Sequence, residues 1–207
     1  MRFGGDKGLL PLDDRTLIEH VYGKVASVAR EVVIAVRSKS QRKAYSQLVR
    51  NCLFVLDEWP GNGPLNGLWS GLKRVTGEKV AVVGCDMPLV SPELMRLLYE
   101  LSWTYDAVIP RWPSGYIEPL HSVYDVDRCR TASTTALRKG RSDMRAMILS
   151  LARALYLSTE AIRKIDSDLN MFVNINTHND LLRTKRILGS QMSTSSPRVC
   201  HNPANYP

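Results

Sequence analysis

The sequence predicts an α/β fold with a mostly parallel sheet, and two patterns in its 207 residues carry this prediction. Short runs of β-branched and other apolar residues, typical of strands buried on both faces, recur along the chain. Segments with apolar residues at helical spacing stand between them. Strands that alternate with helices indicate βα units, in which ligands bind beyond the carboxyl ends of the strands.

The first helix shows the signals used for the others. Leu17, Val21 and Val25 follow one another at helical spacing, and Thr16 precedes them as a suitable N-cap. Later helices begin near Pro64 and after Ser91, since proline is favoured in the first helical turn. The expected helices therefore cover residues 16–29, 41–50, 64–75 and 92–101.

The apolar runs between these helices predict the strands, which are expected at residues 31–36, 52–56, 79–85 and 105–110. From 131 to 155 the pattern is helical, and residues 171–188 close the domain. The segment beyond Leu188 is polar and rich in proline, without periodicity, so we expect one domain over 1–188 and a disordered tail over 189–207.

Composition excludes several classes of protein. The net charge is +8, but the basic residues are spread along most of the chain, and the densest cluster, Arg37 to Tyr45, lacks flanking aromatic residues for base stacking. Charge alone does not decide between nucleic acid and an anionic small molecule, and it is with the motifs below that no nucleic-acid partner is expected. No apolar run is long enough for a membrane helix or a signal peptide, so no membrane partner and a cytoplasmic location are expected.

Cysteine and histidine give no metal motif. The four cysteines are far apart in sequence and include no C-x-x-C pair, and the four histidines are scattered as well. Reduced thiols are expected, and a metal site built from His and Cys is not.

The stretch GGDKGLL places a lysine among glycines before an apolar run. Gly4 and Gly5 would let backbone amides approach phosphate groups, and Lys7 would neutralise a phosphate oxygen. This is not a Walker motif. The alternative interpretation is a lysine in a solvated turn.

Two acidic residues follow expected strands. In VVGCDMPLV, Asp86 would deliver a carboxylate to the ligand edge of the sheet, where one carboxylate with phosphate oxygens and waters suits Mg²⁺. In LDEWPGNGPLNGLWSGL, Asp57 could accept the N1 and N2 hydrogens of guanine as a bidentate pair. Gly61, Gly63 and Gly67 would let the backbone lie against a flat base. A helix-capping role for Asp86 and an ordinary turn after Asp57 are the alternatives.

A last polar group lies in NMFVNINTHNDL. Asn174 and Asn176 would share one face of a strand and offer donors and acceptors to a ligand. Alternatively they turn the chain, and Thr177 caps the next helix.

Taken in order, RFGGDKGLLPL, GPLNGLWSGL, CDMPLV, EPLHSVY and VNINTHNDL resemble the molybdenum cofactor guanylyltransferases, the MobA family of nucleotidyltransferases. The resemblance implies a three-layer, Rossmann-like nucleotidyltransferase sheet. It also implies an Mg²⁺-dependent transfer of GMP from GTP to molybdopterin, with release of pyrophosphate. The molybdoenzymes that receive the cofactor, or their chaperones, are possible further partners.

The resemblance also implies roles for individual residues. Lys7 and Asp86 would be catalytic, with Asp86 as the ligand of Mg²⁺. The nucleotide would be bound by Arg2, Gly4, Gly5, Lys7, Asp57, Gly63, Pro64, Leu65 and Asp86. The acceptor would be bound by Glu118, Pro119, Leu120, Asn174 and Asn176, and on charge alone its phosphate could be neutralised by Arg138, Lys139 and Arg141.

The sequence departs from the family pattern at its start and at two single positions. Members carry an apolar first strand and a loop resembling L-x-G-G-x-S-x-R-M-G, of which this chain has only RFGG onward. A central strand is thus expected to be missing, which would leave unpaired ladder groups on two neighbouring strands; a misassigned start codon is the expected cause. Phe3 and Asn66 replace the usual residues, and neither change is expected to be disabling.

Other functions stay open at this point. A related enzyme could use another nucleotide, as a molybdenum cofactor cytidylyltransferase does. A chain without the full triphosphate loop could also bind the cofactor without catalysis. A nucleic-acid-binding module ranks third and would show strongly salt-dependent binding.

Overall fold

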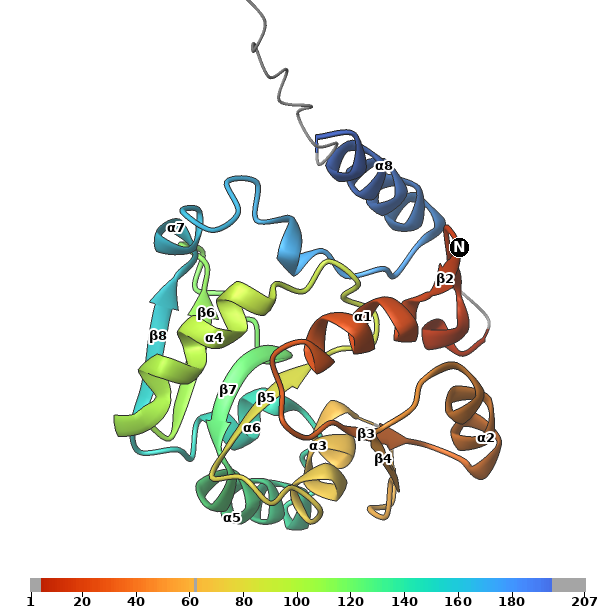
Figure 1. The fold of residues 1–207 in the computed structure, drawn as a ribbon. Coiled ribbons are helices and arrows are strands. Elements are labelled where there is room, and N and C mark those ends of the chain that lie inside the picture. Colours follow the sequence, from red (N-terminus) through yellow and green to blue (C-terminus); the bar gives the residue numbers. More distant parts are fainter. Residues whose placement is uncertain (1–4, 62, 195–207) are drawn as a thin grey trace, which may run out of the picture.

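The computed structural model describes residues 5–61 and 63–194, in which strands and helices alternate (Figure 1). The strands are β1 (Pro11–Leu12), β2 (Arg15–Thr16), β3 (Val33–Val36), β4 (Leu53–Leu56), β5 (Lys79–Val83), β6 (Ala107–Arg111), β7 (His121–Asp125) and β8 (Ala154–Ser158). The α-helices are α1 (Leu17–Ala26), α2 (Lys39–Leu48), α3 (Pro64–Leu72), α4 (Pro92–Leu101), α5 (Val126–Arg138), α6 (Met144–Ile148), α7 (Thr159–Ile162) and α8 (His178–Thr194). The 3₁₀ turns are η1 (Lys7–Leu9), η2 (Ser102–Thr104) and η3 (Asn170–Phe172).

The largest sheet has the strand order β5-β7-β6-β8. Strands β6 and β8 are parallel, whereas β7 runs antiparallel to both β5 and β6. Strands β3 and β4 form a separate parallel pair. The expected α/β class and mostly parallel sheet are confirmed, with β7 as the reversed strand.

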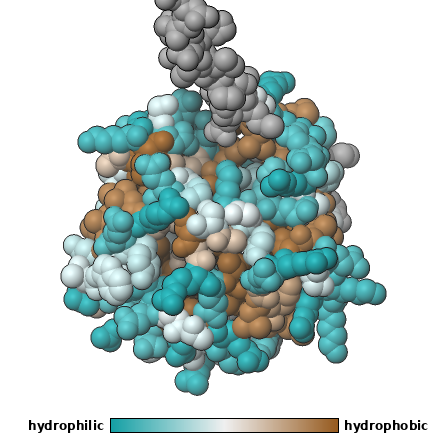
Figure 2. Space-filling model, in the orientation of Figure 1, coloured by the Kyte–Doolittle hydropathy of each residue, from teal (hydrophilic) through white to brown (hydrophobic). Residues whose placement is uncertain are grey.

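Strands β3 and β5 each have one edge without a ladder partner among the residues described, because β3 pairs with β4 and β5 with β7. Ala35 in β3 and Ala81 in β5 are exposed, although both lie within apolar runs. On the face shown in Figure 2, apolar residues reach the surface between hydrophilic ones. The sequence led us to expect unpaired ladder groups on two neighbouring strands, and this stays a prediction, since β4 and β8 also lie at sheet edges.

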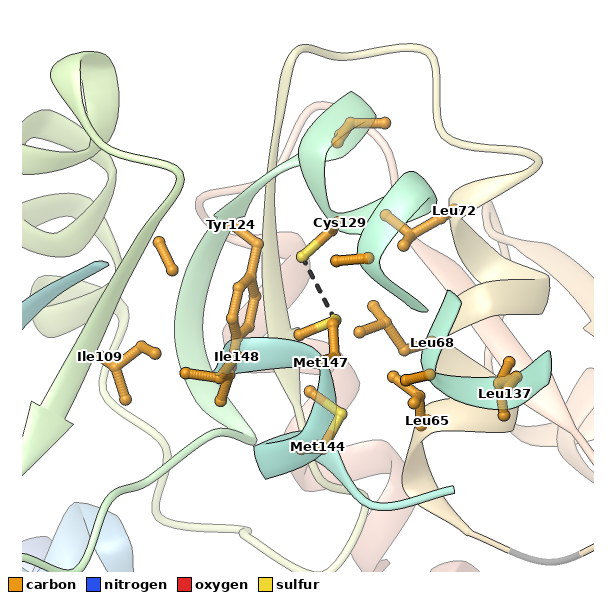
Figure 3. Close-up of a cluster of buried hydrophobic side chains, with 14 residues drawn as sticks. Leu65, Leu68, Leu72, Ile109, Tyr124, Cys129, Leu137, Met144, Met147 and Ile148 are labelled. Carbon is orange, nitrogen blue, oxygen red and sulfur yellow. Dashed lines mark hydrogen bonds between the residues drawn. The ribbon is translucent and has the colours of Figure 1, made fainter. Parts of the chain in front are cut away.

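Successive residues of the central strands face two helical layers. Tyr124 of β7 packs with the cluster built by α3, α5 and α6, whereas its neighbour Val123 packs with α4. Figure 3 shows the first cluster, in which the Cys129 sulfur lies 3.5 Å from the Met147 sulfur. This period-two alternation places the sheet between two layers of helices, as in a three-layer α/β fold.

Local capping explains where several helices begin. Thr16 and Glu19 form a capping box at the start of α1, and the Ser91 hydroxyl accepts the backbone N–H of Leu94 at the start of α4. Pro64 and Pro92 occupy the first turns of α3 and α4. The four helices expected in the first half of the chain are all present.

The region from 131 to 155 differs from the helical pattern expected there. Helix α5 starts earlier, at Val126, and ends before Gly140, whose φ of +73° suits a residue without a side chain. The short helix α6 follows, and residues 154–158 form β8, not a helix. The prediction was wrong here because tertiary pairing with β6 outweighs the helix propensity of Ala-Leu-rich segments.

Helix α8 extends past the boundary expected at Leu188, to Thr194, and residues 195–207 lie outside the described part. Its Leu181 packs with Leu12, Leu17 and Ile175, which joins the C-terminal segment to the start of the chain. Across residues 5–61 and 63–194, every helix is too short or too polar to cross a bilayer.

Candidate functional site

The loop that carries Lys7 is a short, ordered turn. Asp6 caps η1, and its carboxylate accepts the backbone N–H of Gly8 at 3.0 Å. Gly5 is exposed at the start of this loop. Arg2 and Gly4, also predicted to bind the nucleotide, lie outside the described residues.

Lys7 lies between two of the predicted site residues. Its Nζ donates to Asp86 Oδ2 at 3.0 Å and to Asn176 Oδ1 at 2.5 Å. The side chains of Lys7 and Asp86 are 33% and 21% exposed, so the ion pair is open to ligands from solvent. Residues from the beginning, middle and end of the chain thus meet at one point.

The segment after β5 presents the Asp86 carboxylate. Gly84 is buried, and a Cβ at this position would lie 2.8 Å from Asp86 Oδ1, so glycine is needed for the carboxylate to lie there. The carbonyl of Asp86 accepts the backbone N–H of Ile175 at 2.8 Å. This bond attaches the segment that carries Asn176 to the end of β5.

Asn174 and Asn176 do not lie on a strand. Asn176 contacts Lys7, whereas the Asn174 side chain donates to the carbonyl of Phe172 at 3.2 Å. The Thr177 hydroxyl accepts the backbone N–H of Asp180, and the Asp180 carboxylate accepts the N–H groups of Asn176 and Thr177. The two asparagines therefore have different contacts, and Thr177 caps α8.

Asp57 is the first residue after β4. Its Oδ1 is buried and has no hydrogen-bond partner within the described part of the chain. Burial raises the pKa of this carboxyl, and the nearby charge of Arg37 acts in the opposite direction. A buried acceptor without a partner is unfavourable unless a ligand supplies the donor.

Gly63 and Leu65 lie against Ser142, in the turn before α6. Gly63 has a φ of +155°, and a Cβ there would lie 2.5 Å from the carbonyl oxygen of Ser142. That carbonyl accepts the backbone N–H of Leu65 at 3.2 Å, and Pro64 starts α3. Gly67, one turn further along, packs closely on Ala35, since a Cβ there would lie 3.3 Å from the Ala35 Cβ, and it would lie at ordinary contact distance, 3.5 Å, from Asp57 Oδ1.

The Glu118-Pro119-Leu120 turn precedes β7 and lies beside the Asp86 segment. The carbonyl of Leu120 accepts the backbone N–H of Gly84 at 3.2 Å. Glu118 is buried, its Oε1 accepts the indole N–H of Trp112 at 2.7 Å, and burial raises the pKa of its carboxyl. The carbonyl of Pro119 accepts the hydroxyl of Tyr124 at 2.8 Å.

Three basic residues lie at the end of α5 and in the turn that follows it. Arg138 ends α5 and Lys139 is its C-cap, while the Arg141 guanidinium donates to Asp143 at 3.1 Å. The next residue along, Ser142, is the one that contacts Gly63. The turn with these three basic residues therefore adjoins the loop after Asp57.

Two residues of the site were not predicted. Asn66, noted only as a substitution, is 1% exposed and its amide donates to the carbonyls of Trp59 and Gly61, which fixes the loop after Asp57. Arg37 directly follows β3, and Val36, the residue before it, accepts the backbone N–H of Asp57 at 2.9 Å. The position of Arg37 at an expected strand end was the signal that could have identified it.

The donor set suits one magnesium ion better than a metal site made wholly by the protein. The residues described contain no cluster of three or more His, Cys, Asp or Glu side chains able to hold a metal. Mg²⁺ commonly takes one or two carboxylates and completes its shell with phosphate oxygens and water. The Asp86 carboxylate, which is 21% exposed and pairs with Lys7 through Oδ2, is the oxygen ligand that the site could offer to such an ion.

His121, the residue after Leu120, predicts a pH dependence of stability. Its ring is fully buried, 5.2 Å from that of Phe172, and burial lowers its pKa to about 4. An unfolded histidine titrates near 6.5, so the neutral ring stabilises the fold above that pH. As pH falls from 6.5 toward 4, roughly 3 kcal/mol of this contribution should be lost.

The measurement is the free energy of unfolding between pH 7 and pH 4 for the wild type and for His121→Leu. The variant should lose less stability over this range, because it lacks the buried imidazole that takes up a proton more readily in the unfolded chain. His178→Gln, at an exposed histidine, is the matched control and should follow the wild type. Parallel curves for His121→Leu and the wild type would contradict a buried neutral His121.

Comparisons with known proteins agree on one family. A model of the MobA-like NTP transferase domain matches residues 1–154. A probable molybdenum cofactor guanylyltransferase of Methanosarcina mazei is 33% identical over 181 residues, covering 85% of this chain and 80% of the relative. Another, from Methanothermobacter thermautotrophicus, is 34% identical over 185 residues, covering 87% and 91%.

One solved structure agrees with these sequences. The crystal structure of a molybdopterin-guanine dinucleotide biosynthesis protein A from Archaeoglobus fulgidus superimposes with a TM-score of 0.79 at 29% identity, covering 91% of this chain and 93% of that one. The similarity therefore extends over most of the chain and over its fold.

Proposed function

The chain belongs to the MobA-like NTP transferase family, and on this basis we propose that it transfers GMP from GTP to molybdopterin. The product would be the guanine dinucleotide form of the molybdenum cofactor, and pyrophosphate would leave. The observation that carries the proposal is the contact of Lys7 with both Asp86 and Asn176. It unites three segments by which the chain resembles the guanylyltransferases.

The proposed reaction is a displacement at the α-phosphate of GTP. An oxygen of the acceptor phosphate forms the new P–O bond while the bond to the β-phosphate oxygen breaks. Because the acceptor phosphate is already ionised at neutral pH, positioning and charge neutralisation matter more than a general base. We assign no proton-abstracting residue.

In this mechanism Lys7 changes partners. In the free protein its ammonium group contacts Asp86 and Asn176; with GTP bound it neutralises a phosphate oxygen. Asp86 would hold Mg²⁺, which supplies positive charge to the phosphates as the leaving group departs. The exposure of the ion pair makes such a rearrangement possible.

Asp57 would select guanine. Its buried Oδ1 lacks a hydrogen-bond partner among the described residues, and the guanine N1 and N2 hydrogens are two adjacent donors that a carboxylate can accept together. By resemblance to the family, the acceptor side would be formed by Glu118, Pro119, Leu120, Asn174 and Asn176, and the Leu120 carbonyl accepts the backbone N–H of Gly84, two residues before Asp86. The Arg138 to Arg141 turn would approach the phosphates of either substrate.

A comparison of nucleotides tests the proposal. With molybdopterin and Mg²⁺ present, GTP should be used at least about 100-fold more efficiently than CTP, because cytosine cannot offer Asp57 the two adjacent donors of guanine. Pyrophosphate release and dinucleotide formation are the readouts. Equal use of both nucleotides, or preference for CTP, would reject guanylyl transfer in favour of the cytidylyl alternative.

A further inference from the structure

The side chain of Asp6 attaches the Lys7 loop to helix α2. Oδ1 accepts the backbone N–H of Gly8 at 3.0 Å and the hydroxyl of Tyr45 at 2.8 Å. Oδ2 accepts the amide N–H of Gln41 at 2.8 Å. Three donors therefore converge on the carboxylate next to Lys7 in the chain.

The donors from α2 are themselves fixed. Tyr45 is 2% exposed and packs in a cluster with Ile18 and Val36. The Gln41 carbonyl oxygen accepts the backbone N–H of Arg37 at 2.7 Å, and its amide also donates to the Tyr45 hydroxyl at 3.2 Å. Strand β3 ends at Val36 and is paired with β4, the strand that Asp57 directly follows. The network therefore reaches from the Lys7 loop to the end of β3.

Gly8 gives independent evidence that the loop lies directly on Tyr45. A Cβ on Gly8 would lie 2.0 Å from the Tyr45 hydroxyl oxygen and 2.7 Å from the ring carbon that carries it. No side chain can be accommodated at this distance. The contact between Gly8 and Tyr45 therefore fixes the distance between the backbone around Lys7 and helix α2.

We propose that Asp6 is a positioning residue, which through Tyr45 and Gln41 holds Lys7 where the triphosphate of the nucleotide binds. Asp6 contacts no substrate in this proposal, which rests on the proposed function of Lys7. Hydrogen bonds to a charged group are among the stronger hydrogen bonds in proteins. Three of them on Asp6 therefore restrict the motion of this short glycine-containing loop. A loop fixed before the ligand arrives loses less conformational entropy on binding.

The test exchanges donor and acceptor between Asp6 and Gln41. In Asp6→Asn, the new amide group faces the Gln41 amide, so two donors oppose each other. In the double variant Asp6→Asn/Gln41→Glu, the asparagine amide donates to the glutamate, and the total charge is that of the wild type. Dissociation constants for Mg-GTP and for GMP are measured by calorimetry for all three proteins.

We expect Asp6→Asn to weaken Mg-GTP binding about tenfold and to leave GMP binding unchanged, since Lys7 would act on the outer phosphates only. The double variant should recover most of the Mg-GTP affinity. Asp14→Asn, at an aspartate whose side chain is 82% exposed, is the control and should bind both ligands as the wild type does.

The other outcomes separate the two proposals. If Asp6→Asn binds Mg-GTP as tightly as the wild type, the positioning role is wrong and the proposed function stands. If Asp6→Asn loses affinity for Mg-GTP and GMP alike, or the double variant shows no recovery, Asp6 has only a structural role and the proposal is overturned. If the wild type binds neither ligand, the proposed function fails and the positioning role with it.

Discussion

The variant Asp86→Asn should lose nucleotidyl transfer almost completely and remain folded. The neutral amide is a poor ligand for Mg²⁺ and cannot contribute to neutralising charge on the phosphates, so a decrease in kcat of about 10²–10³-fold or more is expected. The backbone carbonyl that binds Ile175 is unchanged, so the segment after β5 keeps its attachment. Steady-state pyrophosphate release at saturating GTP measures the loss.

Stability should change little in the same variant. The Lys7–Asp86 pair is partly exposed on both sides, and ion pairs of this kind contribute about 0–1 kcal/mol. Thermal melts are measured for Asp86→Asn and for the control Asp14→Asn, which removes an exposed carboxylate. Both variants should be folded. Unchanged turnover in Asp86→Asn would refute a metal-binding role for this residue.

Most of the fold follows from local signals in the sequence. The four early helices have caps, prolines or clear periodicity, and the strands between them are uninterrupted apolar runs. Strand β7 was not expected because it starts with His121 and Ser122, which are polar but buried. Strand β8 was missed because its partner β6 lies more than 40 residues earlier in the chain, and sequence periodicity does not report such a pairing.

Among the predicted site residues, Lys7 contacts both Asp86 and Asn176, and these contacts could not be read from the sequence. The motifs pointed to Lys7, Asp86 and Asn176 separately, and only the tertiary structure shows that Lys7 contacts the other two. The network of Asp6 with Tyr45 joins residues 39 positions apart and matches no sequence motif. Long-range hydrogen bonds of this kind depend on how the elements pack, which periodicity and spacing leave undetermined.

Asp57→Asn should nearly abolish the preference for guanine. In place of a carboxylate that accepts from both N1 and N2 of the base, the variant offers one acceptor and one donor, and the donor opposes a guanine hydrogen. We expect kcat/KM for GTP to fall about 100-fold, the loss of one or two hydrogen bonds to a charged group. Because ITP lacks the N2 amino group, the wild type should favour GTP over ITP, and the variant should use both similarly.

The same substitution should not destabilise the fold. Burial raises the pKa of Asp57 above its unfolded value, so the ionised carboxylate is unfavourable in the folded protein at neutral pH. Replacing the carboxylate with a neutral amide removes the unfavourable burial of a charge. The Tm of Asp57→Asn at pH 7 should therefore equal or exceed that of the wild type. The difference should shrink as pH falls toward about 4, where the unfolded carboxyl also takes up a proton.

Lower activity together with equal or higher stability is the pattern expected of a residue kept for ligand binding at some expense to the fold. Oδ1 of Asp57 would then remain buried without a protein partner because guanine supplies the missing donors. A variant with reduced activity and a clearly lower Tm would instead make Asp57 a structural residue of the loop before α3, and the guanine-binding role would be withdrawn.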